Sequence, residues 1–179
     1  RFDNKTAELM TSKGVYVNPT LHVFRSQIWA KQKSMADKPE NKEDILALDI
    51  EKKEFERRVD DVNKLIEFGA KVITGSDSSW GDYQLGNTAY EVECLELAGL
   101  SRSKSIKSVT SESAVSIGVD QSVGTLEKGK EADILVLEKD PYDDIDNLWR
   151  VQDVFLKGTI IKRGSSDSLN LMRQFPPRN

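Results

Sequence analysis

Cysteine and histidine are almost absent from this chain of 179 residues, which contains one of each, Cys94 and His22. A single cysteine excludes an internal disulfide and leaves the redox compartment undetermined. Cys94 falls inside a predicted helix, where a small buried side chain is more common than a reactive thiol. Lone histidines are seldom ligands, so His22 by itself does not indicate a metal site.

Long apolar runs and an excess of positive charge are also missing. No run of about 18 apolar residues exists, so the sequence predicts no membrane span. The net charge is −4, and no basic stripe is present to follow phosphates, which argues against nucleic acid as the main partner. The sequence shows no signal peptide but begins at Arg1 rather than Met. The compartment therefore stays unknown, with a cytoplasmic location as the default expectation.

Two helix–strand units are predicted in the first part of the chain. A helix over 3–13, capped by Asp3, and a strand over 15–17 form the first unit. A long charged helix over 43–68 and a strand over 72–74 form the second. A glycine follows the predicted helix in each unit, Gly14 in the first and Gly69 in the second, as at many helix ends. Alternation of this kind is typical of an α/β fold with parallel strands.

The pattern changes along the rest of the chain. A helix or ordered flap is expected between the two units, and shorter helices follow the second strand; these segments cover 22–38, 87–98, 101–109 and 110–117. After Val119 only strands and turns are predicted, with strands over 132–137, 151–156 and 159–161. The sequence thus divides into an α/β part over 1–118, a β part over 119–163 and a tail over 164–179 expected to be disordered.

One carboxylate stands at the end of the second predicted strand. The run Val72-Ile73-Thr74 is followed at once by Gly75, Ser76 and Asp77. The glycine is interpreted as a point where the backbone turns without a Cβ. Asp77 is then left at the carboxyl end of the strand, where α/β barrels place their reacting groups. The alternative is that Asp77 caps a loop, as aspartate often does.

Four further residues are candidates for substrate binding. Ser78 and Trp80 lie on the loop after Asp77, together with Tyr83, and loops that follow strands often determine specificity. The aromatic side chains either line a substrate pocket or pack the loop, and the sequence favours neither. His22 follows the first strand and either contacts substrate or has a structural role; the structural role is the commoner one for a single histidine.

The spacing of these residues resembles the C-terminal part of the amidohydrolase superfamily, and most of all its imidazolonepropionase-like and Xaa-Pro dipeptidase-like members. The downstream part of the resemblance consists of Thr110, Ala114, Gly118, Gly124, Leu126, Gly129-Lys130, Ala132-Asp133 and Asp140-Pro141. The upstream part consists of Pro19-Thr20-Leu21, Gly75-Ser76-Asp77, Glu91 and Ala98-Gly99-Leu100-Ser101. The resemblance covers about residues 1–163.

The resemblance implies a metal-dependent (β/α)8 TIM barrel joined to a small β-sandwich. The strands over 15–17 and 72–74 would be barrel strands seven and eight, and residues 119–163 would be the C-terminal share of the sandwich. The N-terminal half of the same enzyme would be the main partner. Because two strands of a closed sheet leave unpaired edges, the piece is also expected to form homo-oligomers.

The resemblance further implies hydrolysis of an amide or cyclic amide C–N bond in a small or dipeptide-like substrate. Asp77 falls on the position that binds the metal, zinc or another divalent ion, and accepts the proton of the attacking water. The superfamily also uses a His-x-His pair and further histidines, whereas His22 is the only histidine here. This chain alone is therefore expected to bind no metal, and a non-catalytic structural or interaction fragment is the alternative function.

Overall fold

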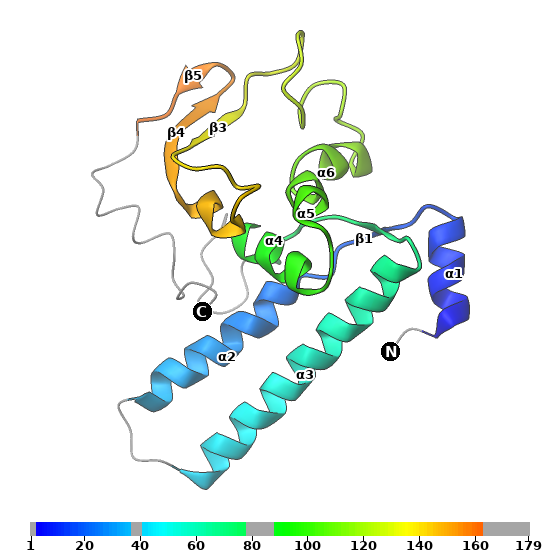
Figure 1. Ribbon diagram of the computed structural model, residues 1–179, viewed down its shortest axis with the longest axis vertical. Coiled ribbons are helices and arrows are strands. Elements are labelled where there is room, and N and C mark those ends of the chain that lie inside the picture. Colours follow the sequence, from blue (N-terminus) through cyan, green and yellow to red (C-terminus); the bar gives the residue numbers. More distant parts are fainter. Residues whose placement is uncertain (1–2, 37–40, 78–87, 163–179) are drawn as a thin grey trace.

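The computed structural model describes residues 3–36, 41–77 and 88–162 (Figure 1). Helix α1 (Asn4–Ser12) begins at Asp3, whose carboxylate accepts a hydrogen bond of 2.7 Å from the backbone N–H of Thr6. This bond lowers the pKa of the Asp3 carboxyl. The chain leaves α1 through Gly14 with φ of +63° and enters strand β1 (Tyr16–Val17). The predicted sequence of cap, helix, glycine and strand is confirmed.

A helical hairpin connects β1 to the second parallel strand. Helices α2 (Leu21–Ala36) and α3 (Lys42–Glu67) pack against each other and extend away from the rest of the chain (Figure 1). Gly69, with φ of +82°, follows α3 and leads into β2 (Lys71–Val72). Strands β1 and β2 pair in parallel, with Val17 opposite Val72. The segment over 22–38, expected as a helix or a flap, is helical through Ala36.

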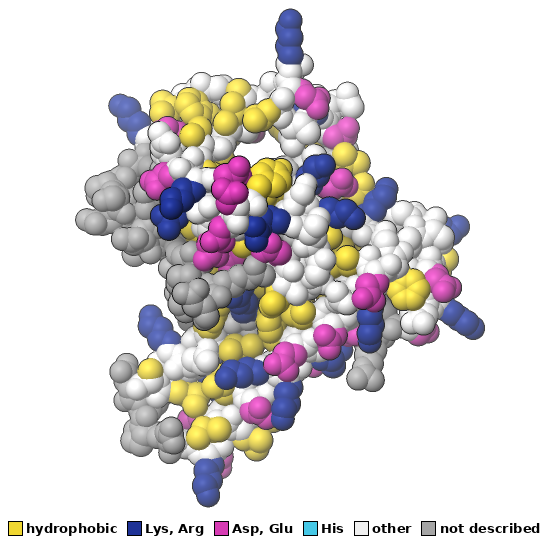
Figure 2. Space-filling model, in the orientation of Figure 1, with side chains coloured by type: hydrophobic (Ala, Val, Ile, Leu, Met, Phe, Trp, Pro, Cys, Tyr) yellow, Lys and Arg dark blue, Asp and Glu magenta, His cyan; other side chains and the backbone are white. Residues whose placement is uncertain are grey.

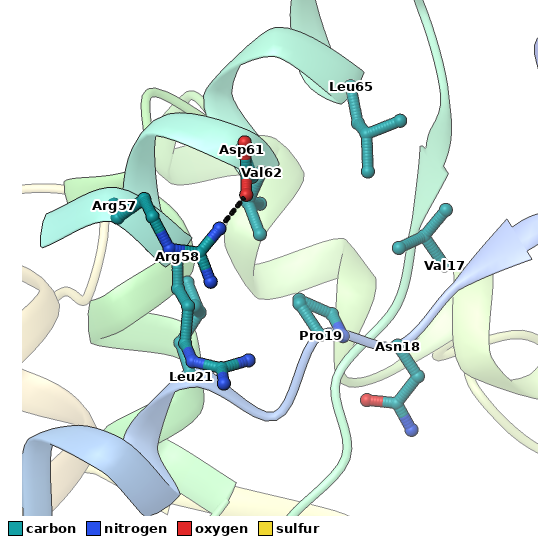
Figure 3. A pocket seen from close by; sticks show the side chains of 9 residues that line it. All are labelled: Val17, Asn18, Pro19, Leu21, Arg57, Arg58, Asp61, Val62 and Leu65. Atoms are coloured by element: carbon teal, nitrogen blue, oxygen red, sulfur yellow. Dashed lines mark hydrogen bonds and ion pairs between the residues drawn. The ribbon is translucent and has the colours of Figure 1, made fainter. Parts of the chain in front are cut away.

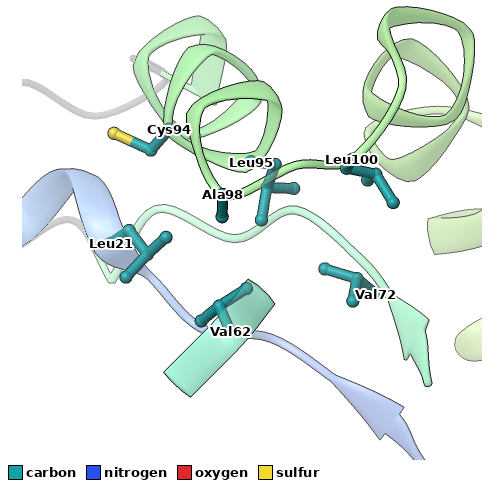
Figure 4. Close-up of a cluster of buried hydrophobic side chains, with 7 residues drawn as sticks. All are labelled: Leu21, Val62, Val72, Cys94, Leu95, Ala98 and Leu100. Carbon is teal, nitrogen blue, oxygen red and sulfur yellow. The ribbon is translucent and has the colours of Figure 1, made fainter. Parts of the chain in front are cut away.

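The core lies where the helices converge on the parallel pair (Figure 4). Helix α4 (Thr88–Leu97) contributes Cys94 and Leu95, both fully buried. The whole cluster consists of Leu21, Val62, Val72, Cys94, Leu95, Ala98 and Leu100. Burying a Val or Leu side chain stabilises a fold by about 1.5–3 kcal/mol. These side chains therefore hold α2, α3, α4 and β2 in one arrangement.

Two short helices fix the chain that leaves β2. Helix α5 (Arg102–Ser108) begins after Ser101, and α6 (Ser111–Ser116) follows. The Thr74 N–H donates to the Ser108 carbonyl at 3.0 Å, and the two hydroxyls lie 2.6 Å apart. Ser101 stands at the predicted cap position of α5, but its side chain makes no capping hydrogen bond.

The second sheet is antiparallel, with strand order β3-β4-β5. Its strands are β3 (Ile134–Leu137), β4 (Val151–Leu156) and β5 (Thr159–Ile160), and the 3₁₀ helix η1 (Ile145–Trp149) precedes β4. The Asp133 carboxylate accepts a hydrogen bond of 2.8 Å from the Lys157 N–H at the hairpin turn. The predicted change from parallel to antiparallel strands is confirmed. The division at residues 118 and 119 stays a prediction, and residues 163–179 lie outside the described chain.

Apolar side chains are exposed at several places on the surface, two of which are seen in Figure 2. Figure 2 shows hydrophobic groups over the antiparallel sheet and toward the far end of the α2–α3 hairpin. The exposed residues there are Leu135, Leu156, Ile160 and Ile161 on the sheet and Ile45, Leu46 and Ile50 on α3. No helix among the described residues is long and apolar enough to cross a membrane.

The Cys94 thiol is expected to be unreactive in the folded protein. It is fully buried, and burial raises its pKa to about 12. Because the thiolate is the nucleophile, iodoacetamide at about pH 8 should modify Cys94 only after denaturant is added. Mass spectrometry of labelled samples measures this directly. Labelling of the native protein at the rate of a free cysteine peptide would contradict the core described above.

Candidate functional site

Asp77 lies beyond the carboxyl end of β2 with its side chain exposed. Its φ is +44°, in the left-handed region that few non-glycine residues adopt, although Asp and Asn tolerate it better than most. No hydrogen bond or ion pair joins the Asp77 carboxylate to any other described residue. The loop that Asp77 would cap begins at residue 78, outside the described residues, so the catalytic and the capping interpretation of Asp77 both stay predictions.

The corresponding tip of β1 has the same backbone feature. Thr20, three residues after β1, has φ of +49°. Among described non-glycine residues, the only other positive φ belongs to Lys157, in the β4–β5 turn. Residues held in sparsely populated conformations cluster at functional sites. The two neighbouring strand tips therefore share a constrained backbone at the edge where α/β proteins bind ligands.

Gly75 leaves room for a neighbouring side chain, which differs from the role that the sequence suggested. Its φ is not in the left-handed region, so the turn there does not need a glycine. Instead, a Cβ at position 75 would lie 2.6 Å from Asn18 Oδ1 and 2.7 Å from Asn18 Cγ. Glycine at this position lets the Asn18 carboxamide lie across the tip of β2, two residues before Asp77. Sequence reasoning missed this contact, because it joins residues 57 positions apart.

His22 is placed in the interior, with 2% of its surface exposed. Its backbone N–H donates to Glu91 Oε2 at 2.7 Å, and its Nδ1 lies 3.3 Å from the same oxygen. Glu91 is completely buried on α4. These contacts attach the beginning of α2 to α4 and agree with the structural interpretation of His22. Substrate contact by His22 stays a prediction.

A second buried carboxylate connects α4 to η1. Glu93 is completely buried; its Oε1 accepts a hydrogen bond of 2.6 Å from the Trp149 indole N–H. Its Oε2 accepts a longer one, of 3.4 Å, from Arg25. The Trp149 ring also packs on Tyr90, with ring centroids 4.4 Å apart. These polar and aromatic contacts thus hold η1, the segment before β4, against α4 and connect α4 to α2.

Replacing Trp149 with Phe is expected to destabilise the protein by about 1.5–3 kcal/mol, the usual contribution of a hydrogen bond to a charged group. Phe keeps an aromatic ring beside Tyr90, so most of the loss reports the missing indole N–H. Urea denaturation of the variant and the wild type measures the difference. A change smaller than about 0.5 kcal/mol, within the range of an ordinary surface substitution, would show that the Glu93 contact is not needed for stability.

The loop that carries the other predicted site residues lies outside the described residues. Ser78, Trp80 and Tyr83 fall in the range 78–87, so their roles as substrate-binding residues stay predictions. Of the five residues proposed from sequence, the structure places Asp77 five residues beyond the end of β2 and His22 in the interior. It does not bring these two together at one described site.

The described residues do not form a metal site by themselves. No group of three or more His, Cys, Asp or Glu side chains among them is arranged to hold a metal ion. Zinc sites use three or four protein ligands. Asp77 could supply one, while His22 and Cys94 are buried elsewhere. A divalent metal therefore does not fit this set of residues without ligands from outside it.

A pocket of about 340 Å³ lies between the end of β1 and α3 (Figure 3). It is lined by Val17, Asn18, Pro19, Leu21, Arg57, Arg58, Asp61, Val62 and Leu65. Arg57 donates to Asp61 at 2.6 Å and to both carboxylate oxygens of Glu54. The hydrogen bond from Arg57 lowers the pKa of Glu54 to about 2. The pocket does not include Asp77, and the Arg57 charge is already balanced by carboxylates.

Comparison with known proteins identifies the family of this chain. The profile of the amidohydrolase family matches residues 2–161, which is most of the chain. The chain belongs to the amidohydrolase family. The resemblance seen in the sequence motifs is thereby confirmed at the level of the family.

Individual relatives of this amidohydrolase chain are distant and longer. It is 28% identical over 156 residues to the ochratoxinase of Aspergillus niger, covering 80% of this chain and 28% of that protein. It is 28% identical over 105 residues to the imidazolonepropionase of Thermoplasma volcanium, covering 56% of this chain and 26% of that protein. The chain thus spans little more than a quarter of the length of these relatives.

Solved structures show the same relation. A Xaa-Pro dipeptidase with methionine bound in its active site superposes with a TM-score of 0.71 at 25% identity, over 90% of this chain and 38% of that one. The A. niger ochratoxinase gives a TM-score of 0.67 at 25% identity, over 89% of this chain and 34% of that one. The amidohydrolase chain therefore shares its fold with a part of larger hydrolases.

Proposed function

We propose that this chain is the C-terminal part of a metal-dependent amidohydrolase that cleaves an amide or cyclic amide C–N bond. The observation that carries the proposal is Asp77: an exposed carboxylate with a constrained backbone at the tip of a parallel strand, in a chain of this family. In this proposal β1 and β2 are the last two strands of a TIM barrel, and the antiparallel sheet belongs to a β-sandwich.

Asp77 has two roles in the proposed reaction. Its carboxylate is a ligand of a divalent metal, zinc being the first candidate, and it is the general base that takes a proton from the attacking water. A bound divalent ion supplies the acidity, since it lowers the pKa of coordinated water to about 7. The carboxylate at the strand tip has no other described partner, which leaves an oxygen available to accept that proton.

The remaining metal ligands are proposed to come from the N-terminal half of the same enzyme. This follows from the absence of a three-ligand group among the described residues. The apolar side chains Leu135 and Leu156 on the antiparallel sheet are half exposed and offer a surface for further strands of the enzyme. The chain by itself is proposed to be inactive, and the complete protein to act on small amide or dipeptide-like substrates.

The test is hydrolysis by the full-length protein that contains this chain. A panel of Xaa-Pro dipeptides, N-acyl amino acids and small cyclic amides, assayed with added zinc, manganese or cobalt, covers the proposed substrate class. Release of a free amine from at least one panel member, abolished by a chelator, is the expected result. A full-length protein that cleaves none of them with any of the metals would overturn the proposed function.

A further inference from the structure

The Asn18 side chain is a polar group beside the ends of β1 and β2, and it has no role in the reaction proposed above. Asn18 follows β1 directly, and its side chain is exposed. No hydrogen bond joins its carboxamide to another described residue. Yet the group lies against the backbone of Gly75, which has no Cβ that would overlap it. The chain therefore keeps space beside Gly75 for an amide that has no hydrogen-bond partner among the described residues.

The direction of this side chain follows from strand geometry. Side chains alternate between the two faces of a strand. Val17 and Asn18 both border the pocket against α3. Val72, the register partner of Val17, is buried in the cluster that includes Val62 of α3, so the Val17 and Val72 side chains share the α3 face. Asn18 is therefore expected on the opposite face of the pair from α3. Figure 3 shows its carboxamide extending from β1 away from the α3 side chains. The face away from the helices is the one that surrounds the interior of a barrel.

We propose that Asn18 binds the substrate, and that Gly75 is present so that the Asn18 carboxamide can lie beside the reacting carboxylate. The proposal rests on the proposed function. A carboxamide offers N–H donors and a carbonyl acceptor in one plane. That set is complementary to the C=O of the amide cleaved next to Asp77, and to its N–H where the amide is secondary. Asn18 is thus assigned to the amide group of the substrate.

Two substitutions at position 18 test the contact in the full-length protein, with the panel substrate that the wild type cleaves fastest. Asn18→Ala removes the carboxamide and should raise KM about tenfold, the loss of roughly one net hydrogen bond, while kcat stays within about twofold. Asn18→Asp keeps the shape but cannot donate, so KM should rise at least as much. Both variants should unfold near the wild-type temperature, because Asn18 makes no described hydrogen bond.

Asn63 provides a matched control. Its side chain also lies against a glycine: a Cβ at Gly99 would be 2.6 Å from Asn63 Nδ2. This amide, however, donates to the Ala98 carbonyl at 3.0 Å, between α3 and the end of α4. Asn63→Ala should lower the unfolding temperature and leave KM and kcat unchanged. Comparing Asn63→Ala with Asn18→Ala therefore shows whether a rise in KM depends on the amide being at the strand tips.

A double substitution tests the role assigned to Gly75. Gly75→Ala should displace the Asn18 carboxamide and so raise KM about tenfold, as Asn18→Ala does. Because both changes remove the same contact, the double variant should also show a rise of about tenfold rather than 100-fold. If the two substitutions acted independently, their effects on KM would multiply to about 100-fold. A 100-fold rise in the double variant would overturn the link between Gly75 and Asn18.

The outcomes separate this proposal from the function on which it rests. If Asp77→Asn abolishes hydrolysis while Asn18→Ala keeps the wild-type KM, the function stands and the Asn18 contact is wrong. If Asn18→Ala lowers kcat without changing KM, Asn18 acts through Asp77 and does not bind substrate, which also overturns the proposal. If the wild type cleaves no panel member, the proposed function fails and the Asn18 assignment fails with it.

Discussion

Asp77→Asn is expected to lower the turnover of the full-length protein by at least about 100-fold, since general-base assistance alone contributes about 10²–10⁴-fold. Asparagine keeps the size of the side chain but removes its charge and its basic oxygen. It also tolerates the left-handed backbone that Asp77 adopts. The thermal midpoint should therefore stay close to that of the wild type. Steady-state kinetics on the best panel substrate, with a parallel melting curve, measures both effects.

Two control variants show whether the loss belongs to Asp77. Asp133→Asn changes a carboxylate that only accepts the hydrogen bond from the Lys157 N–H, so turnover should not change. His22→Ala should affect turnover far less than Asp77→Asn, because His22 is buried against Glu91. Near-normal turnover of Asp77→Asn would show that the carboxylate is not the reacting base.

Leu95→Ala is expected to destabilise the protein by about 2–5 kcal/mol, the range for a leucine removed from a packed core. Leu95 is completely buried on α4, in the cluster that joins α2, α3 and β2 (Figure 4). The lost free energy combines the transfer of the side chain with the cavity that remains. A lower urea midpoint at unchanged slope is the expected measurement.

Leu97→Ala on the same helix is the matched control. Leu97 is 49% exposed, so its replacement should change the free energy of unfolding by much less. Both substitutions exchange the same residue types in one helix, which cancels the difference in helix propensity. Equal losses of unfolding free energy in Leu95→Ala and Leu97→Ala would show that the face of α4 carrying Leu95 is not the buried one.

Local features of the fold were predictable because they depend on neighbouring residues. Asp3 and Gly14 bound the first helix, and Gly69 ends α3, since capping and left-handed glycines act within a few positions. The parallel pair, the helices and the antiparallel hairpin also followed from local periodicity. The second strand was predicted over 72–74 but is Lys71–Val72 in the structure, so Asp77 lies five residues beyond its end.

Contacts between distant segments were not predictable in this way. Glu91 was noted as part of the family pattern, but its pairing with His22 joins residues 69 positions apart. The Glu93–Trp149 hydrogen bond spans 56 positions. The role of Gly75 was misread because the sequence does not show why a glycine is present. A glycine can serve an unusual backbone conformation, or it can leave space for a neighbouring side chain. Only the packing of Asn18 across β2 distinguishes the two.

The divalent-metal content of purified protein tests the central claim most directly, namely that Asp77 is the contribution of this chain to a metal-dependent hydrolytic site. Three preparations are compared after dialysis: the full-length protein, its Asp77→Asn variant and the 179-residue chain alone. The account predicts stoichiometric metal in the full-length protein, a reduced content in the variant and none in the isolated chain. Tight binding of one zinc by the isolated chain, or equal metal in the variant and the wild type, would contradict it.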